Sequence, residues 1–420
     1  MLETLLGFWW LPLPVAIVIV FRGWWLSSKI SRYINSIEWV ILEMRIPKDN
    51  LKSIKSMEQV FASLHGTYSQ GIKRRERWFQ GNVEDWISLE IAGFAHGVHF
   101  FIRTPKKYRK LVEAAFFSQY PDAEIEEAED YTAVLPRDLP NDEFDIWGTD
   151  YVLARDNAYP IKTYVNFEQM LQFEEMTIDP LATVVEVISN LKDNELILLQ
   201  LLVRPISPEW TAGAKRTVDE LTGKSVGGKK LFDMGGMTEF LGNLSKAPLI
   251  HPEWSGSSAT PSAPERLTPG KQDILKAVEG KMSKLAFDAT FRFIYIDKKS
   301  EFSGENVTAV VGAINQFAAL NLNAFKPNMK TITIPSKVGL FNRKERLVRR
   351  KKLLFQHYLF RDIAQPPPFR FGLKFKTSIL NAEELATIYH PPLATVTAAK
   401  LRVLETRKGE PPVNLPVVEE

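Results

Sequence analysis

The sequence predicts an α+β protein in which an N-terminal transmembrane helix precedes two ferredoxin-like units. Three observations lead to this prediction. A stretch without charged residues runs from Leu5 to Phe21. Two later regions each show the order strand, helix, strand, strand, helix, strand, which is the split βαβ arrangement. A long insertion that includes a Ser/Pro-rich stretch separates the second and third strands of the second region.

The uncharged N-terminal stretch is the candidate membrane anchor. A helical span needs about 20 mostly apolar residues, and the stretch reaches this length if Gly23–Leu26 lie in the far interface. Indole rings prefer the headgroup level of a bilayer, and two pairs of them flank the apolar centre. The predicted anchor residues are therefore Trp9, Trp10, Trp24 and Trp25.

Basic residues follow this stretch and none precedes it: Arg22, Lys29 and Arg32. The positive-inside rule then predicts a single-pass protein of the inner (cytoplasmic) membrane with its body in the cytoplasm. A cleaved signal peptide is the first alternative, but Glu3 is the only charged side chain before the stretch and no A-x-A-like site follows it. A buried core helix is the second alternative, which Pro12 and Pro14 disfavour.

Composition limits the function classes. The chain has 420 residues, which predicts two or three domains. Hydrophobic residues make up 45% and charged residues 25%, as in ordinary globular proteins. The net charge of +3 gives no global signal for nucleic-acid binding. Because cysteine is absent, disulfides, thiolate zinc sites and cysteine nucleophiles are excluded.

The first unit is predicted for residues 36–140, after an anchor and juxtamembrane segment of residues 1–35. Its strands follow from alternating apolar residues and its helices from apolar residues at i, i+3, i+4 and i+7. The strands are expected at 38–46, 86–92, 98–103 and 123–128, and the helices at 57–64 and 104–116. Thr104-Pro105 predicts the start of the second helix, as a cap residue before proline.

The second unit is predicted for residues 141–335. Its strands are expected at 161–167, 195–204, 287–295 and 331–334, and its helices at 181–191 and 307–317. Asp179-Pro180 is the predicted start of the first of these helices. The insertion covers residues 206–283, with helices expected at 212–221 and 271–284 and a flexible, Ser/Pro-rich stretch at 256–269.

The last segment, residues 336–420, is predicted to hold a basic helix and an extended C-terminal tail. The helix lies within Arg343–Arg361 and offers five basic side chains as phosphate or lipid contacts: Arg346, Arg349, Arg350, Lys351 and Lys352. Exposed cations attract nucleic-acid phosphate or anionic headgroups. The alternative that these residues only form a solvated helix face is kept, since runs of charged residues usually have that role. A second basic stretch beside Trp78 leaves the same alternatives open: Lys73, Arg74, Arg75 and Arg77.

Motifs for catalysis are not found. Gly223-Lys224-Ser225 is similar to the end of a phosphate-binding loop, but Val218 stands where the loop needs its first glycine. His96 and His99 lie across one predicted hairpin without a third ligand nearby. No serine lies in a nucleophile-elbow pattern. The sequence therefore predicts a protein that is not an enzyme, with no cofactor and no metal.

Six segments are distinctive as an ordered set: 38–48, 88–125, 178–205, 317–325, 380–392 and 410–416. Together they resemble the N-terminal region of uncharacterised membrane-anchored bacterial ATPases of the conjugation, or type IV secretion, class. In such proteins a segment like EELATIYHPP (383–392) lies shortly before a motor domain with a phosphate-binding loop. No such loop follows up to Glu420. The resemblance implies an accessory half whose ATPase is supplied by a separate chain or lost.

These observations lead to one main functional hypothesis and one alternative. The main hypothesis is a non-enzymatic, membrane-anchored scaffold of a type IV secretion or conjugation-like machine that docks a separate ATPase. The alternative is a membrane-tethered nucleic-acid-binding protein. The expected partners are the membrane and the ATPase subunit, with nucleic acid in the alternative and a homo-oligomer left open.

Overall fold

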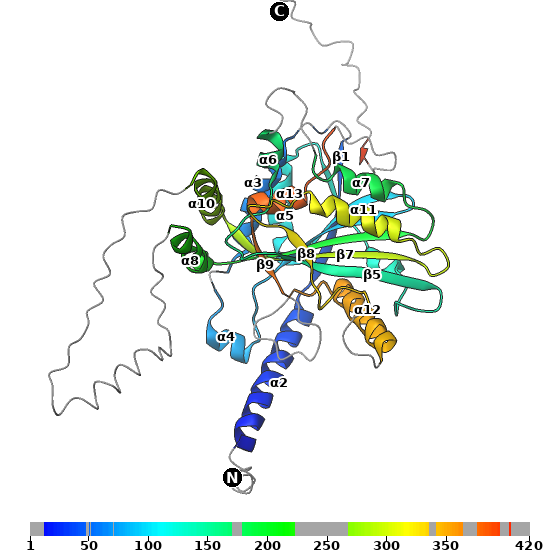
Figure 1. Ribbon diagram of the computed structural model, residues 1–420. Helices are drawn as coiled ribbons and strands as arrows, with labels where there is room; N and C mark the ends of the chain where they lie inside the picture. The colour runs from blue at the N-terminus through cyan, green and yellow to red at the C-terminus, as the bar shows by residue number, and fades with distance from the viewer. Residues whose placement is uncertain are drawn as a thin grey trace, which may run out of the picture.

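A single sheet of ten strands forms the centre of the computed structural model (Figure 1). The structure describes residues 12–47, 50, 52–69, 71–169, 179–222, 268–335, 342–363, 376–394 and 403–404. Eight of the strands follow one another in the order β10-β1-β3-β2-β6-β7-β5-β8, while β4 pairs with β1 and β9 pairs with β7.

The first half of the sheet is built from the N-terminal part of the chain. Its strands are β1 (Trp39–Pro47), β2 (Ile87–Phe94), β3 (Gly97–Pro105) and β4 (Glu124–Glu127). The helices between them are α3 (Ile54–Leu64), α4 (Arg74–Phe79) and α5 (Arg109–Gln119). The antiparallel pairs give the order β4-β1-β3-β2. This is the order that a strand–helix–strand–strand–helix–strand unit adopts when both of its crossovers pass over one face.

The second half repeats this arrangement with a longer chain. Its strands are β5 (Phe144–Leu153), β6 (Leu196–Pro205), β7 (Ala286–Lys298) and β8 (Phe325–Pro327). Its helices are α6 (Tyr164–Gln169), α7 (Ala182–Ser189) and α11 (Gly304–Asn315). Between β6 and β7 lie α8 (Thr211–Leu221) and α10 (Pro269–Met282), which pack on each other through Ala214 and Val278.

The two halves meet edge to edge through the second strand of each. β2 and β6 are antiparallel, and their register pairs residues 87–93 with residues 203–197. We call this β2–β6 contact the seam. On each side of it, the second strand of the half is followed outward by its third, its first and its fourth strand, as the orders β4-β1-β3-β2 and β6-β7-β5-β8 show. One large apolar cluster extends across it and includes Leu89 and Leu199 on opposite sides. The residues on both sides of the seam thus share one core.

The C-terminal segment adds elements to both halves. α12 (Arg343–Leu359) lies on one face of the sheet, and β9 (Ser378–Asn381) extends along β7. α13 (Ala382–Ile388) packs against α3, and β10 (Val403–Leu404) pairs in parallel with β1.

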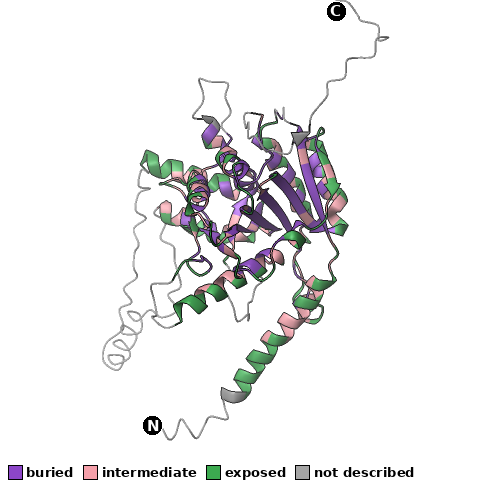
Figure 2. Cartoon of the chain, turned by 90° about the vertical axis from the view of Figure 1, so that its right-hand side faces the viewer, coloured by how far each residue is buried: buried purple, intermediate pink, exposed green. Residues whose placement is uncertain are grey.

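Two different sets of helices cover the two faces of the sheet. Figure 1 shows α3, α5, α7, α11 and α13 above it, with α2 (Pro12–Ser36), α4 and α12 below. The central strands β1, β3, β2, β6 and β7 are almost entirely buried between these layers (Figure 2), whereas the edge strand β4 is mostly exposed. On the lower face, a second buried cluster packs Leu198 and Ile294 of the sheet against Leu354 of α12.

The expected membrane span is wrong. Among the described residues, no helix combines the length and the apolar character that crossing a bilayer requires. In α2 the apolar run ends at Phe21, and Arg22, Lys29 and Arg32 follow within the same helix. Its C-terminal half packs on the folded body, where Ile30 is 5% exposed. The single-pass inner-membrane placement that depended on this span is wrong too; Leu5–Leu11 lie outside the described residues.

Two predicted strands of the second half are also wrong. Residues 161–167 form a loop and the start of α6, and Ile161, Tyr164 and Phe167 are buried at a spacing of three, which fits a helical turn and not a strand. The first strand is instead β5. Residues 331–334 run beside β5 with one backbone bond, from the Thr333 N–H to the Gly148 carbonyl oxygen (3.0 Å). The other bonds use threonine hydroxyls, which accept from the backbone N–H groups of Gly148 (2.8 Å) and Asp150 (3.0 Å), so no strand forms. The last strand of the half is instead β8.

The predicted helix start at Thr104-Pro105 is displaced. Both residues end β3, a 3₁₀ turn of Lys106–Tyr108 follows, and α5 begins at Arg109. Most of the Ser/Pro-rich stretch 256–269 lies outside the described residues, and Pro269 is the first residue of α10.

Candidate binding face around the basic helix

The basic helix α12 is fixed to the sheet by its C-terminal half. Leu354, Phe355 and Tyr358 are buried against the lower face, at spacings that place them on one side of the helix. The first turns, by contrast, lie in solvent from Asn342 to Arg346. Asn342 precedes the helix with a positive φ of 55°, a backbone conformation that asparagine tolerates better than most residues. The sheet thus holds one end of α12 and leaves its most basic end exposed.

On the face of the sheet that α12 covers, four polar side chains form a row across its centre. The registers of neighbouring strands place Glu90 opposite Gln200, Gln200 opposite Arg292, and Arg292 opposite Asp150. Gln200 donates to Glu90 (Nε2–Oε1, 3.1 Å), and Arg292 donates to Gln200 (Nη1–Oε1, 2.7 Å) and to Asp150 (Nε–Oδ1, 2.7 Å). All four side chains are buried, so the low dielectric strengthens each of these bonds.

Arg361 closes the row at the end of α12. Its guanidinium contacts both carboxylate oxygens of Glu90 (2.8 and 3.1 Å) and both of Asp130 (2.9 Å each). Its carbonyl oxygen accepts from Trp86 Nε1 at 3.0 Å. The Tyr131 hydroxyl donates to Glu90 at 2.6 Å and is hydrogen-bonded to the Tyr358 hydroxyl. These acids and bases are therefore turned toward one another and bind α12 to the sheet.

The pKa values fit this structural role. Burial alone would raise the pKa of Glu90, but the charge and hydrogen bonds of Arg361 hold it below its ordinary value. Glu90 is therefore an ionised partner of Arg361 and not a proton donor. The tyrosine hydroxyls beside it are desolvated, and the pKa of Tyr131 is raised well above its usual value by burial and then by the Glu90 charge.

The five predicted contact residues of α12 do not form one set. Arg350 donates to the carbonyl oxygen of Ile332 (Nη1–O, 2.8 Å), and Lys351 pairs with Asp145 (Nζ–Oδ1, 2.6 Å). These two side chains therefore attach α12 to the β5 side of the sheet. Three of the five lie on exposed positions of the helix: Arg346, Arg349 and Lys352. Their contact with phosphate or lipid stays a prediction.

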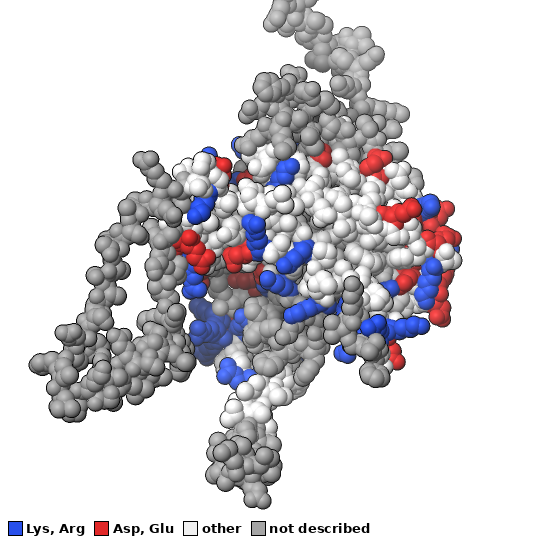
Figure 3. Space-filling view, viewed as in Figure 1, with Lys and Arg blue, Asp and Glu red and all other residues white. Residues whose placement is uncertain are grey.

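The second basic stretch lies on the same lower face. α4 packs beside α2, where Trp25 Nε1 donates to the Trp78 carbonyl oxygen at 3.1 Å and the Arg22 guanidinium lies 5.3 Å from the Trp78 ring centroid. Lys73, Arg74 and Arg75 are exposed, whereas Arg77 is half-buried. Figure 3 shows Lys and Arg side chains over both α4 and α12 in the lower part of the molecule. Of the predicted anchor residues, Trp24 is 64% exposed, and Trp9 and Trp10 lie outside the described residues.

A groove of about 450 Å³ lies between α12 and the segment 130–139. Its floor is apolar and consists of Leu135, Leu139 and Phe355. Phe360, which is 68% exposed, and the polar ends of Lys352 and Arg137 stand at its edge. The groove is thus an apolar depression beside the basic side chains of α12.

A second groove, of about 560 Å³, lies beside α10 and the segment 160–166. The buried ion pair of Lys281 and Glu384 (Nζ–Oε2, 3.0 Å) lies at this groove, and Lys284 beside it pairs with Glu58 (2.8 Å) and with Glu383. Burial lowers the pKa of Lys281, and the carboxylate of Glu384 opposes that shift. These charges already have partners within the fold. The other charged residues of the lining are Asp273 and Lys276, which are exposed and of opposite sign, so the groove favours neither anions nor cations.

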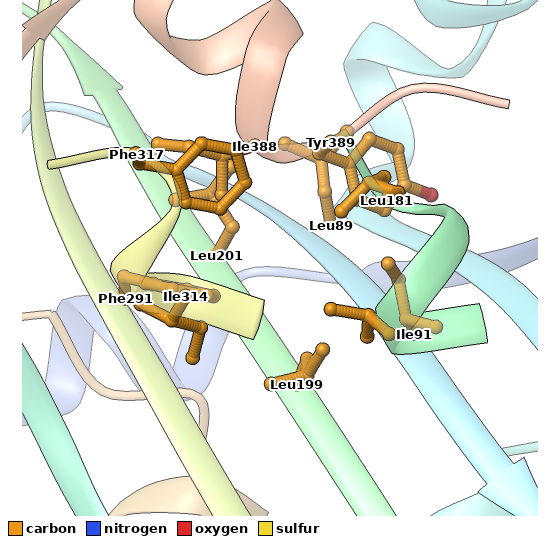
Figure 4. A pocket seen from close by; sticks show the side chains of 11 residues that line it. Leu89, Ile91, Leu181, Leu199, Leu201, Phe291, Ile314, Phe317, Ile388 and Tyr389 are labelled. Atoms are coloured by element: carbon orange, nitrogen blue, oxygen red, sulfur yellow. The ribbon is translucent and has the colours of Figure 1, made fainter. Parts of the chain in front are cut away.

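A third cavity is a core void with no room for a ligand. Its volume is about 10 Å³, and apolar side chains from β2, β6 and β7 face others from α7, α11 and α13 across it (Figure 4). Leu199, Phe291 and Tyr389 are among those that line it. A space of this size holds at most one water, and an apolar lining gives that water no partners.

The segment Asn381–Leu393 joins the two halves of the sheet. Asn381 and Glu384 form a reciprocal capping box at the start of α13. On the second half, His390 bonds to Asp179 (Nε2–Oδ1, 3.0 Å), which also accepts from the Leu393 N–H (2.9 Å). On the first half, the Asn50 amide donates to the Pro392 carbonyl oxygen (3.1 Å). The segment therefore has a fixed place between the two halves. The predicted extended C-terminal tail at 411–420 lies outside the described residues.

Sequence reasoning missed the polar row and Arg361. The available signal was a single polar residue within an otherwise apolar strand, as with Glu90 between Leu89 and Ile91, and Gln200 between Leu199 and Leu201. Which of these residues would meet depended on the strand order. No group of His, Cys, Asp and Glu within the described ranges is arranged to hold a metal ion. The glycine–lysine–serine motif at 223–225 lies outside those ranges.

Comparison with known proteins gives one family. A model described as "Domain of unknown function (DUF8128)" matches residues 32–352, from the last turns of α2 to the middle of α12. The chain belongs to this family. Among curated proteins none matches the sequence. The family match therefore covers both halves of the sheet and their seam, while β9 and α13 lie beyond it.

Proposed function

We propose that this member of the DUF8128 family is a non-enzymatic docking scaffold for an ATPase carried by a separate chain, in a conjugation-like or type IV secretion machine. The observation that carries the proposal is the double attachment of Asn381–Leu393 to both halves of the sheet. In the ATPases that the sequence resembles, a segment of this kind lies shortly before the motor. The two halves of the sheet, by fixing this segment, would form a rigid platform that holds a docked motor in one orientation.

The buried charges support a structural role over a catalytic one. Glu90, Arg361, Lys281 and Glu384 each have a charged partner inside the fold. Catalytic acids and bases instead need to face a site that substrate can enter. The Glu90–Arg361 pair joins the end of α12 to β2, and the Lys281–Glu384 pair joins α13 to α10, so both pairs serve rigidity. A rigid platform suits docking because less ordering entropy is lost when a partner binds.

The test is isolation of the tagged full chain from its own cells under native conditions, with the bound proteins identified by mass spectrometry. An ATPase with a phosphate-binding loop should be enriched over a tag-only control. The purified chain alone should not hydrolyse ATP. Absence of any enriched ATPase, or hydrolysis that purifies with this chain, would contradict the proposal.

The nucleic-acid alternative has one observation in its favour, the exposed cations of α12 and α4. Such cations bind nucleic-acid phosphate with a steep dependence on salt, because bound counterions are released. Binding of duplex DNA by the full chain at low salt would favour this alternative.

A further inference from the structure

The groove between α12 and residues 130–139 combines an apolar floor with basic edges. Leu139 is fully buried at its base, and Leu135 and Phe355 are 4% and 2% exposed. Leu359 and the exposed ring of Phe360 form one side of it. A side chain seated there would lose its water contacts against aliphatic and aromatic carbon, which is the usual source of affinity at a docking anchor.

The charges around this groove are mainly positive. Lys352 and Arg137 stand at its edge, and Arg349 lies one helical turn before Lys352 on the same side of α12. Of the two acids that line it, Asp130 accepts two bonds from Arg361, which also pairs with Glu90, and the charge of Arg103 acts on both Asp130 and Glu90, so two cations balance them. Asp138 is the remaining acid. The balance therefore favours an anionic ligand.

The groove also follows the axis of a helix. Lys352, Phe355, Gln356 and Leu359 line it at i, i+3, i+4 and i+7 of α12. This spacing places them on one continuous stripe along the helix. A helical partner segment with apolar residues at the same spacing can lie along such a stripe, as in other helix-in-groove complexes.

We propose that this groove binds an acidic amphipathic segment of a partner protein, with an apolar side chain inserted between Phe355 and Leu135. The proposal rests on the docking function above and names the surface and the chemistry of the docked segment. Nucleic acid fits this groove less well, because its phosphates would leave the apolar floor unused and Phe360 is the one exposed aromatic ring among the lining residues.

The test measures binding of fluorescein-labelled peptides to the purified full chain by fluorescence anisotropy. The first peptide has leucine at i, i+3, i+4 and i+7 and glutamate at its outer positions. The second keeps the leucines and has lysine for glutamate, and the third keeps the glutamates and has serine for leucine. We expect the first to bind at least about tenfold more tightly than either control, which corresponds to 1.4 kcal/mol.

Substitutions in the groove locate the binding. Lys352→Glu and Phe360→Ser change exposed side chains, so the melting temperature should stay at the parent value while binding of the first peptide weakens at least about fivefold. Lys271→Glu, an exposed lysine of α10, makes the same charge change at a distance and should leave binding unchanged. If Phe360→Ser lowers the melting temperature, Arg137→Glu at the opposite edge replaces it.

Three results would overturn the inference. The first is equal binding of all three peptides, and the second is an equal loss of peptide affinity in Lys271→Glu and Lys352→Glu. The third is displacement of the peptide by duplex DNA, together with peptide binding by Phe360→Ser that equals binding by the parent. Failure here is separable from failure of the proposed function. An ATPase that copurifies equally with parent and Lys352→Glu would leave the scaffold intact and place its docking surface elsewhere. Peptide binding without a copurifying ATPase would support the groove as a docking surface and contradict the proposal that its partner is an ATPase.

Discussion

Arg361 and Glu90 form a two-contact ion pair that joins the end of α12 to the central strand β2, with Nε–Oε1 and Nη2–Oε2 distances of 2.8 and 3.1 Å. The two residues are 271 positions apart in the sequence, and both side chains are at most 1% exposed. Arg361 has a φ of 52°, a left-handed conformation that costs a residue with a Cβ about 1–2 kcal/mol. The surrounding contacts of the guanidinium offset that cost.

Arg361→Ala should therefore be strongly destabilising. It leaves the Glu90 carboxylate buried without its charged partner, and breaking a buried pair in this way costs about 3–5 kcal/mol. Urea unfolding of the full chain measures the loss. The double variant Glu90→Gln with Arg361→Met should lose less, because no uncompensated charge remains. Arg137→Ala, at an exposed arginine, is the control; an Arg361→Ala variant as stable as this control would show that the pair does not hold α12.

Gly93 and Ile188 report on the contact between β2 and α7. A Cβ added at Gly93 would lie 2.1 Å from Ile188 Cγ2, so the strand and the helix are closer there than an alanine allows. Gly93→Ala should lower the free energy of unfolding by about 1–3 kcal/mol through overpacking. Ile188→Ala should lower it by about 2–5 kcal/mol through a cavity.

The double variant should be more stable than the sum of the single effects predicts, because the new methyl group occupies part of the space that Ile188 leaves. A thermodynamic double-mutant cycle from urea unfolding measures this coupling. Strictly additive effects would mean that the two side chains do not meet in solution.

Stability should also depend on pH through Glu43. Its hydrogen bond to His99 (Nδ1–Oε1, 2.7 Å), with a further bond to Arg45, outweighs the opposing effect of burial and lowers the pKa of Glu43 to about 2. A carboxyl whose pKa is lower in the folded state than in the unfolded state stabilises the fold above the unfolded pKa. That contribution is lost as the pH falls from about 4.5 toward 2.

The parent should therefore lose up to about 3 kcal/mol more than Glu43→Gln between pH 6 and pH 2, given about 1.4 kcal/mol for each pKa unit. Comparing the two proteins removes the effect of other acids that titrate in the same range. Parallel stability curves for parent and variant would contradict the assignment.

The basic residues of α12 should separate into two groups by their effects. Arg350→Gln with Lys351→Gln removes the contacts to Ile332 and Asp145 and should lower the melting temperature. The triple change of Arg346, Arg349 and Lys352 to glutamine touches exposed side chains and should leave the melting temperature near the parent value. If the helix contacts DNA, the triple change should also flatten the slope of log affinity against log salt.

Calorimetry and DNA anisotropy at several salt concentrations measure these two effects. The reverse pattern, with the triple variant less stable and the double variant weaker in DNA binding, would show that the contacts of Arg350 and Lys351 are not structural.

Local patterns in the sequence were sufficient for most of the secondary structure. Alternation of apolar residues marked β1 and β7, and apolar residues at helical spacing marked α3 and α11, because those periods depend only on which side of an element is buried. Local patterns gave a wrong prediction where the surroundings of a segment could not be inferred from its own residues. Ile161–Phe167 has apolar residues that suit a strand, but they cover α13 as a loop and a short helix. The apolar N-terminal stretch likewise suggested a bilayer span, whereas α2 continues through Arg22, Lys29 and Arg32 onto the body.

By itself the sequence determined the α+β class, the exclusion of cysteine chemistry and the position of the basic helix, since composition and periodicity are properties of short stretches. Only the tertiary structure decided that β2 and β6 join two halves into one sheet and that Glu90, Gln200, Arg292 and Asp150 align across it. It also decided that Arg350 and Lys351 are structural while Lys352 faces a groove. Strand register and helix docking bring together residues hundreds of positions apart, and no local period encodes which of them will meet.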